Sequence, residues 1–227
     1  MLHAITDNIW EEIQDLVMPG RIHFSCRMTV IRLGDGSLLL HSPVRRNEEL
    51  AEALAKLGPV RHLVAPNCLH HLFLKEWADA YPEARVYAAP GLEKKRKDLR
   101  IDEELGGQAP AAWREEMEQC FIGGTPWLSE IVFFHRPSKT LIVTDLVFHI
   151  HDTKGLVTHM VMRMAGVWRR LTQSRMIRLF VKDRAAAGAS VRNMLHWDFE
   201  RVIMAHGEIV EKDARKVMPQ ALAWMLG

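Results

Sequence analysis

Three separated strand-like segments of this chain end in histidine or aspartate, and this recurrence constrains the fold more than any other feature. The segments are Arg61–His71, which ends in two histidines, Thr140–Asp145, and Arg201–Gly207, whose polar residue is His206. Each begins as a short run of β-branched and aliphatic residues, a pattern typical of a buried strand. In an α/β fold the ends of neighbouring strands meet at one edge of the sheet, where ligands bind. We therefore predict an α/β fold that brings these polar side chains together.

The polar residues at these strand ends form a set of metal-binding side chains. They are His70, His71, Asp145 and His206. Three imidazoles and one carboxylate suit zinc, iron or manganese. Neighbouring residues in a strand point to opposite faces, so His70 and His71 can both bind one ion only if residues 68–71 form a loop. The sequence predicts a metal site with these four ligands.

Composition places the chain among ordinary globular proteins. Of its 227 residues, 48% are hydrophobic and 26% are charged, and the formal net charge of +2 gives no general attraction to nucleic acid or membranes. No apolar run approaches the ~18 residues of a membrane span, and no signal peptide is evident at the N-terminus. The three cysteines, Cys26, Cys68 and Cys120, are odd in number and widely spaced, which favours a reducing compartment. We expect a soluble cytoplasmic protein. The sequence does not indicate its oligomeric state.

Local patterns predict alternating strands and helices. Residues 29–33 and 37–41 flank Gly34-Asp35-Gly36, a turn typical of a β-hairpin. Asn47 is a suitable N-cap for a helix over 48–56, which Gly58-Pro59 ends. Further strands are predicted over 60–65, 84–88, 130–135, 141–144 and 201–205, and further helices over 72–80, 185–197 and 214–226.

The segment Leu156–Val181 is predicted to be one helix, rich in methionine and in basic residues. Its apolar side contains Met160, Met164, Val167, Trp168 and Leu171. The basic residues here are Arg163, Arg169, Arg170, Arg175, Arg178 and Lys182. We favour a packed helix whose long basic side chains reach solvent. The alternatives are a basic amphipathic element that lies on an anionic surface, or a lid.

A set of short motifs extends over most of the chain. It comprises Arg27–Leu33, His41–Val44, Ala65–Asn67 with His70-His71, Trp77, Tyr81-Pro82 and Ala205–Gly207. These motifs resemble the metallo-β-lactamase superfamily, and more narrowly a degenerate branch of it that is classed only as a domain of unknown function. The resemblance implies an αββα sandwich of mixed sheets flanked by helices, with a metal site along one edge. We expect one such domain over residues 1–227, with a helical insertion at about 150–185 that covers the cleft.

The departures from the superfamily pattern fall mainly on one of its two metal positions. The aspartate of the first motif is replaced by His41-Ser42-Pro43. The histidines that would hold the first metal map to Pro66, Cys68 and Gly124, whereas the ligands of the second map to His70, His71, Asp145 and His206. The resemblance therefore implies one divalent ion, zinc or iron, at the second position, with histidine replacing aspartate at residue 70.

Two functions remain open. The first is a mononuclear metal-dependent hydrolase of an unidentified small molecule, because a bound divalent metal lowers the pKa of water to about 7. The second is a non-catalytic descendant of the fold that uses the old cleft for a structural metal, a small molecule or a partner. We do not expect nucleic-acid processing, since the net charge is near zero and no RNA-binding motif is present. The catalytic residues and the substrate are not identified by the sequence.

Other candidate groups lie near the predicted ligands. His149 and His151, followed by Asp152, form an H-x-H pair whose side chains would share one strand face. We expect both at the rim or surface, with metal binding as the alternative. Cys68 could bind a metal as a thiolate, but we expect a small buried residue. Glu130 and His135 could hydrogen-bond a ligand histidine.

Overall fold

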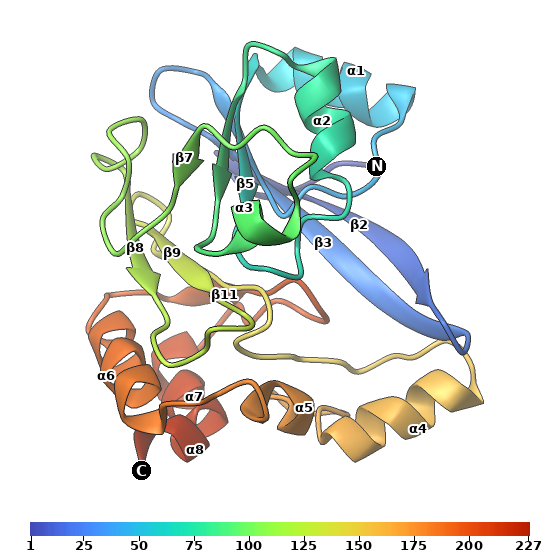
Figure 1. The fold of residues 1–227 in the computed structure, drawn as a ribbon, viewed down its shortest axis with the longest axis vertical. Coiled ribbons are helices and arrows are strands. Elements are labelled where there is room, and N and C mark those ends of the chain that lie inside the picture. Colours follow the sequence, from blue (N-terminus) through green and yellow to red (C-terminus); the bar gives the residue numbers. More distant parts are fainter.

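The structure, a computed structural model, describes residues 1–227 and consists of two stacked sheets with helices on both outer faces (Figure 1). Three buried clusters define these layers: one between the first sheet and its helices, one between the sheets, and one between the second sheet and the C-terminal helices. The predicted αββα sandwich of mixed sheets is confirmed. No helix has the length and apolar character needed to cross a membrane.

The first sheet contains seven strands in sequence order. They are β1 (His3–Thr6), β2 (Ile9–Met18), β3 (Ile22–Arg32), β4 (Leu38–His41), β5 (Val60–Ala65), β6 (Arg85–Ala88) and β7 (Glu103–Glu104). Strands β1 to β4 pair antiparallel, and β4 to β7 pair parallel. The hairpin predicted around Gly34-Asp35-Gly36 is the β3–β4 connection.

The central strands are apolar on both faces because both faces are covered. In β4, Leu38 and Leu40 pack toward the helices, whereas Leu39 packs between the sheets. In β5, Leu63 faces the helices and Val64 faces the other sheet. This double burial explains why these strands are continuous apolar runs and show no hydrophobic–polar alternation.

The second sheet has four strands in the order β11-β10-β9-β8. They are β8 (Met117–Phe121), β9 (Ile131–His135), β10 (Thr140–Ile142) and β11 (Arg201–Ile203). The predicted hairpin of β9 and β10 is confirmed. Strands β10 and β11 run parallel, with Ile142 opposite Ile203, so the segments that follow them leave the sheet side by side.

The outer layers contain the helices predicted over 48–56, 72–80, 185–197 and 214–226, and also the short α3 (Leu92–Lys95), which was not predicted. One contains α1 (Glu48–Leu57), α2 (Leu74–Ala80) and α3, and the other α6 (Arg184–Leu195), α7 (Ala214–Ala221) and α8 (Ala223–Leu226). Asn47 caps α1 as predicted, since its side chain accepts a hydrogen bond of 2.7 Å from the Leu50 amide. The single helix predicted over 214–226 is interrupted at Leu222, between α7 and α8.

The single helix predicted over 156–181 is wrong. The structure has α4 (Leu156–Ala165) and the short α5 (Arg175–Arg178), joined by an irregular segment. Gly166 ends α4 in the left-handed conformation, with φ of 75°, and its amide bonds back to the last turn. Glycine adopts this conformation without a Cβ penalty, which makes it a common helix terminator. The apolar side chains predicted to lie on one side of a single helix, from Met160 to Leu171, therefore do not lie on one helical face.

Candidate metal centre

Three of the four predicted ligands meet at one edge of the sandwich. Ligand atoms of His70, Asp145 and His206 all lie within 4.8 Å of one another. Nε2 of His70 is 3.3 Å from one carboxylate oxygen of Asp145, and Nε2 of His206 is 3.5 Å from the other. The three residues follow β5, β10 and β11, so strand ends bring them together as the sequence indicated.

Each of the two histidines is oriented through its other ring nitrogen. Nδ1 of His206 donates a hydrogen bond of 2.7 Å to the Ser25 carbonyl, and Nδ1 of His70 hydrogen-bonds with the Ser42 hydroxyl at 2.6 Å. Both rings therefore present Nε2 to Asp145. Outer partners of this kind fix ring orientation and tautomer at metal sites. Phe148 also stacks on the His206 ring, with centroids 5.3 Å apart.

Asp145 is held by buried polar groups on both sides. Glu130, which is fully buried, accepts hydrogen bonds from the amides of Thr144 and Asp145 at 2.7 and 2.9 Å. The side-chain amide of Asn67 donates to Asp145 at 2.8 Å. The sequence suggests Glu130 as a hydrogen-bond partner of a ligand histidine, but in the structure it holds the backbone of Thr144 and Asp145. Sequence patterns did not reveal Asn67, although it belongs to the Ala65–Asn67 motif at the end of β5.

Electrostatic interactions within the site shift the pKa values of Asp145 and His206 in the direction opposite to the effect of burial. Burial by itself would raise the pKa of Asp145, but the His70 and His206 rings outweigh it and hold the pKa below its usual value. Burial would lower the pKa of His206, yet the Asp145 carboxylate, and to a smaller extent Cys26, raise it to about 10. Burial and the nearby charge of Asp145 raise the pKa of Glu130 to about 7. The buried carboxylate of Asp145 therefore stabilises positive charge between the two rings.

His71 lies outside this group, unlike the other three predicted ligands. Residues 67–73 form the loop that the prediction required, and the Asn67 side-chain oxygen accepts from the amides of Leu69 and His70, each at 2.8 Å. Within this loop the two histidines separate, and His71 Nδ1 accepts a hydrogen bond of 2.8 Å from Arg96. Burial, with the charges of Lys95 and Arg96, lowers the pKa of His71 to about 4. A neutral ring that uses Nδ1 in this way keeps its proton on Nε2, so neither nitrogen is free for a metal.

Of the positions that map to the superfamily's first metal, Gly124 packs directly against another segment of the chain, and Cys68 is buried. Gly124 has φ of 71°, and a Cβ there would lie 2.0 Å from the carbonyl oxygen of Asp183. The Gly124 carbonyl accepts hydrogen bonds from the amides of Lys182 and Asp183, at 2.7 and 3.2 Å. Cys68 is buried, as expected, and burial raises its pKa, so it remains a thiol. The backbone of residues 182–183 therefore occupies the space that a side chain at 124 would need.

The remaining candidates lie elsewhere. Ligand atoms of His149, His151 and Glu208 form a second group within 4.8 Å of one another. His135 hydrogen-bonds with Ser138 at 2.7 Å, away from the ligand histidines. His41, at the place of the first-motif aspartate, is fully buried with its edge against Phe133, and burial lowers its pKa to about 3. Ser42, its neighbour, is the residue of that motif that contacts the site.

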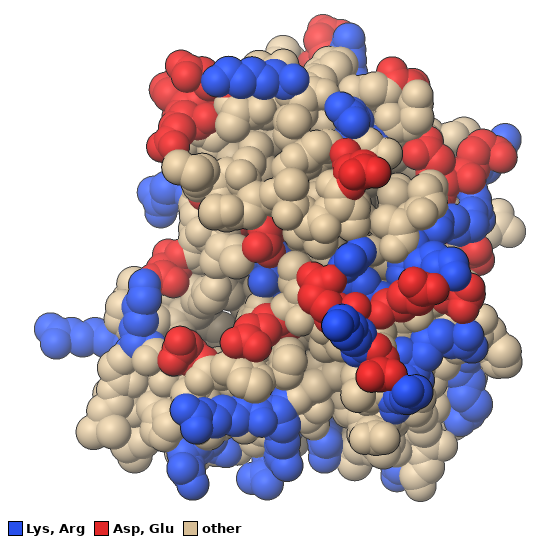
Figure 2. Space-filling model, turned by 180° about the vertical axis from the view of Figure 1, so that it is seen from behind, with Lys and Arg blue, Asp and Glu red and all other residues tan.

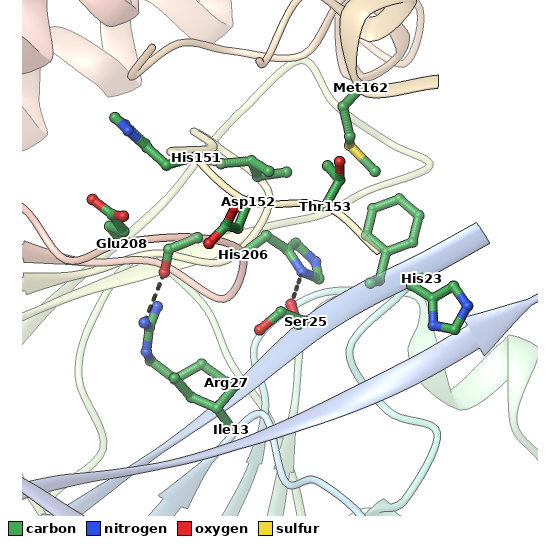
Figure 3. A pocket seen from close by; sticks show the side chains of 13 residues that line it. Ile13, His23, Ser25, Arg27, His151, Asp152, Thr153, Met162, His206 and Glu208 are labelled. Atoms are coloured by element: carbon green, nitrogen blue, oxygen red, sulfur yellow. Dashed lines mark hydrogen bonds between the residues drawn. The ribbon is translucent and has the colours of Figure 1, made fainter. Parts of the chain in front are cut away.

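A pocket of about 260 Å³ opens beside His206 (Figure 3). Its walls come from β3, from residues 150–153 with Met162 of α4, and from residues 206–208. Arg27, which is 5% exposed, donates a hydrogen bond of 2.7 Å to the Gly207 carbonyl and also bonds the Met204 carbonyl. The segment that carries His206 is therefore anchored to β3. The predicted insertion at about 150–185 contributes one side of this pocket.

Comparison with known proteins identifies solved structures with a similar fold. No curated protein matches the sequence. A metallo-β-lactamase from Pontibacter korlensis superimposes with a TM-score of 0.68 at 14% identity, over 98% of each chain. The metallo-β-lactamase from Hirschia baltica gives 0.67 at 12% identity, over 100% of this chain and 97% of that one. The metallo-β-lactamase FIM-1 from Pseudomonas aeruginosa, in its mono-zinc form, gives 0.65 at 13% identity, over 100% and 96%.

These likenesses establish the metallo-β-lactamase fold. A family model described as "Domain of unknown function (DUF4336)" matches residues 6–178, about three quarters of the chain. The protein therefore belongs to that family, which here has the metallo-β-lactamase fold.

Proposed function

We propose that this protein binds one divalent ion, zinc or iron, through His70, Asp145 and His206, and uses it to hydrolyse a small molecule. The observation that carries the proposal is the arrangement of two Nε2 atoms around one buried carboxylate, at 3.3 and 3.5 Å. His71, which the sequence also suggested, is not part of the proposed set because Arg96 donates to its ring.

The separations between the ligand atoms support a metal. A hydrogen bond between nitrogen and oxygen spans about 2.7–3.2 Å, so both contacts with Asp145 are longer than a typical one. Ligands about 2.1 Å from a tetrahedral ion lie roughly 3.4 Å from one another. Each imidazole is thus about as far from a carboxylate oxygen, His70 from one and His206 from the other, as two ligands of one ion are. The carboxylate that favours a proton on His206 would favour a divalent cation for the same electrostatic reason.

Three protein ligands leave a coordination position free, as in catalytic zinc sites. A divalent ion would supply Lewis acidity and would lower the pKa of water to about 7. The protein's own residues would do the rest. Ser42 and Ser25 hold the two rings, Glu130 holds the aspartate, and Phe148 shields one face of His206. The adjacent pocket of about 260 Å³ suits a small substrate.

A non-catalytic descendant of the fold remains the second candidate. It is favoured by His70, because the superfamily motif has an aspartate there, and by the obstruction at Gly124, which excludes the first metal's histidine. In this alternative the same three residues would hold a structural ion. We place either function in the cytoplasm because Cys26, Cys68 and Cys120 are all unpaired.

Elemental analysis of protein purified without added metal tests the metal. We expect about one equivalent of zinc or iron in the wild type and loss of it in Asp145→Asn and His70→Gln. His71→Gln is the matched control, because the adjacent histidine lies outside the group and glutamine can still accept from Arg96. Unchanged metal content in folded Asp145→Asn, checked by circular dichroism, would refute the site.

Hydrolysis assays then separate the two candidates. Metal-replete protein is tested on phosphoesters, lactones and thioesters, with the His206→Gln variant in parallel. Turnover that is lost in His206→Gln but kept in His71→Gln supports the hydrolase. Full metal occupancy with no turnover of any substrate favours the structural ion.

A further inference from the structure

A second group of metal-binding side chains lies beside the pocket, with two of its three members, His151 and Glu208, in the pocket wall. His149 and His151 follow β10 in sequence, and Glu208 follows β11. Backbone pairing connects the two segments: the Glu208 amide donates to the His149 carbonyl at 2.8 Å, and the His149 amide donates to the His206 carbonyl at 3.2 Å. Gly207 permits this approach, since a Cβ there would lie 2.1 Å from the His149 carbonyl oxygen. The cluster is therefore built by the fold.

The two imidazoles are arranged as ligands are. His149 Nδ1 donates to the Glu208 carbonyl at 3.1 Å, which leaves the lone pair on Nε2. His151 Nε2 is buried and has no hydrogen-bond partner. The two rings stand nearly perpendicular, with their centroids 4.5 Å apart. A buried ring nitrogen without a partner is uncommon in folded proteins, and the one in His151 lies in a group with two other metal-binding side chains.

We infer that His149, His151 and Glu208 bind a second divalent cation, of the zinc class, beside the proposed centre. Two imidazoles and one glutamate form a known ligand set for zinc with an open position. The ligand atoms lie within 4.8 Å, and Glu208 is exposed, so its side chain is free to rotate closer. His151, Glu208 and His206 all line the same pocket (Figure 3). The pocket would then be bordered by two cations, although the superfamily's first position is lost.

Zinc stoichiometry tests this inference. Metal-stripped full-length protein is titrated with zinc against a chromophoric chelator, and bound zinc is then measured by elemental analysis. We expect two equivalents in the wild type, one in His151→Gln, one in Asp145→Asn, and none in the double variant. Glu211→Gln, an exposed glutamate outside the cluster, is the control and should keep two.

The outcomes distinguish this cluster from the proposed centre. One equivalent in the wild type, lost in Asp145→Asn and kept in His151→Gln, overturns the second site and leaves the first. One equivalent lost in His151→Gln and kept in Asp145→Asn supports this cluster and overturns the first. Two equivalents kept in folded His151→Gln overturn the inference.

An independent observation concerns the outer surface of α4 and α5. Residues 154–184 carry eight Lys or Arg and only one acidic residue, a net charge of +7 in a chain whose total is +2. Six large apolar side chains in this segment are 50–76% exposed: Leu156, Val157, Met160, Met164, Met176 and Leu179. We call these residues the basic apolar face. Helices α4 and α5 lie in the lower part of Figure 1, and Figure 2 shows Lys and Arg along that end of the molecule.

The inner side of α4 already has its packing partners. Thr158, Met162 and Ala165 are buried, and the last two pack in a small cluster with Phe148 and Ile150. The outward stripe of Leu156, Met160 and Met164 recurs every four residues and therefore follows one side of the helix. Apolar side chains that extend from a strongly basic surface are typical of elements that lie in a membrane interface.

We propose that the basic apolar face binds an anionic lipid bilayer. The charge argues against a second copy of this chain as the occupant, because two faces of +7 would repel each other. Anionic headgroups complement it, and clustered basic residues strengthen interfacial binding together with buried apolar side chains. Membrane association would hold the protein by α4, whose Met162 lines the pocket.

Vesicle co-sedimentation tests this second proposal. We expect binding to phosphatidylcholine vesicles that contain phosphatidylserine, no binding to phosphatidylcholine alone, and release by salt. The paired variant Arg163→Glu with Arg175→Glu should weaken binding roughly tenfold or more. Met160→Gln with Met164→Gln should weaken it as well, whereas Leu72→Gln, exposed elsewhere, should not. Absence of binding to anionic vesicles refutes the proposal, as does a dimer that Met160→Gln with Met164→Gln dissociates.

Discussion

The two positions at which the superfamily binds metal differ sharply in this protein. At one, His70, Asp145 and His206 are buried, face one another and have hydrogen-bonded partners behind them. At the other, Gly124 lies against the backbone of Asp183, with no room for a side chain. At the position that aligns with the superfamily's third-motif histidine, packing against Asp183 therefore excludes a side chain. Restoring one histidine would not recover the metal position.

Two buried histidines, His206 and His41, differ from each other in a similar way. His206 faces a carboxylate and its pKa is raised to about 10, whereas burial lowers the pKa of His41 to about 3. Nε2 of His41 has no hydrogen-bond partner. Burial is common to both, so the presence of Asp145 accounts for the opposite directions.

The largest expected effect comes from Gly124→His, which restores the superfamily's residue. A Cβ 2.0 Å from a backbone carbonyl, at a positive φ, must displace residues 182–183. We expect the free energy of unfolding to fall by about 2–5 kcal/mol, from overpacking and backbone strain together. Urea denaturation measures it, and metal content should not rise. Gly106→Ala is the control, because a Cβ there meets nothing within 4 Å. A stable Gly124→His variant that gains an ion would contradict the comparison.

An intermediate effect is expected from His41→Gln on the pH dependence of stability. The folded pKa of His41, about 3, lies below the unfolded value of 6.5, so the unfolded chain takes up the proton first as the pH falls. The contribution of neutral His41 to the free energy of unfolding is present above pH 6.5 and is lost progressively toward pH 3. At pH 5 the loss relative to pH 8 is about 2 kcal/mol.

Denaturation of metal-free protein at pH 8 and pH 5 measures this difference. His41→Gln should lose about 2 kcal/mol less between the two pH values than the wild type. His3→Gln, which alters an exposed histidine, should lose as much stability between pH 8 and pH 5 as the wild type does. If His41→Gln lost as much unfolding free energy between pH 8 and pH 5 as the wild type, His41 would not account for the loss of stability in acid.

The smallest effect is expected from Ser42→Gly on metal affinity. This substitution removes the hydroxyl that hydrogen-bonds with His70 Nδ1 at 2.6 Å, and glycine tolerates the φ of 55° found there. Loss of such an outer partner weakens metal binding by about 10- to 100-fold. Competition with a chelator measures the affinity. Ser138→Ala is a matched control, since Ser138 makes an equivalent contact with His135 outside the site. Equal weakening in both variants would contradict a specific role for Ser42.

Much of the fold was predictable because its signals are local. The β3–β4 hairpin, the Asn47 cap and the buried strands each depend on a few neighbouring residues. The predictions were wrong where a single residue redirected the chain. Gly166 ended the helix predicted over 156–181, because its left-handed conformation outweighs the helical spacing of the apolar residues around it. The predicted insertion therefore contains two short helices and an irregular segment.

For the candidate metal centre, the sequence by itself determined which segments would meet. His70, Asp145 and His206 each follow an apolar strand, and in α/β folds the carboxyl ends of the strands form the edge at which ligands bind. Tertiary structure alone decided which of two adjacent histidines faces the carboxylate. Arg96, distant in sequence, turns His71 away, while Ser42 and Ser25 orient the rings that face Asp145. Hydrogen bonds between distant segments fix side-chain direction, and no local pattern encodes them.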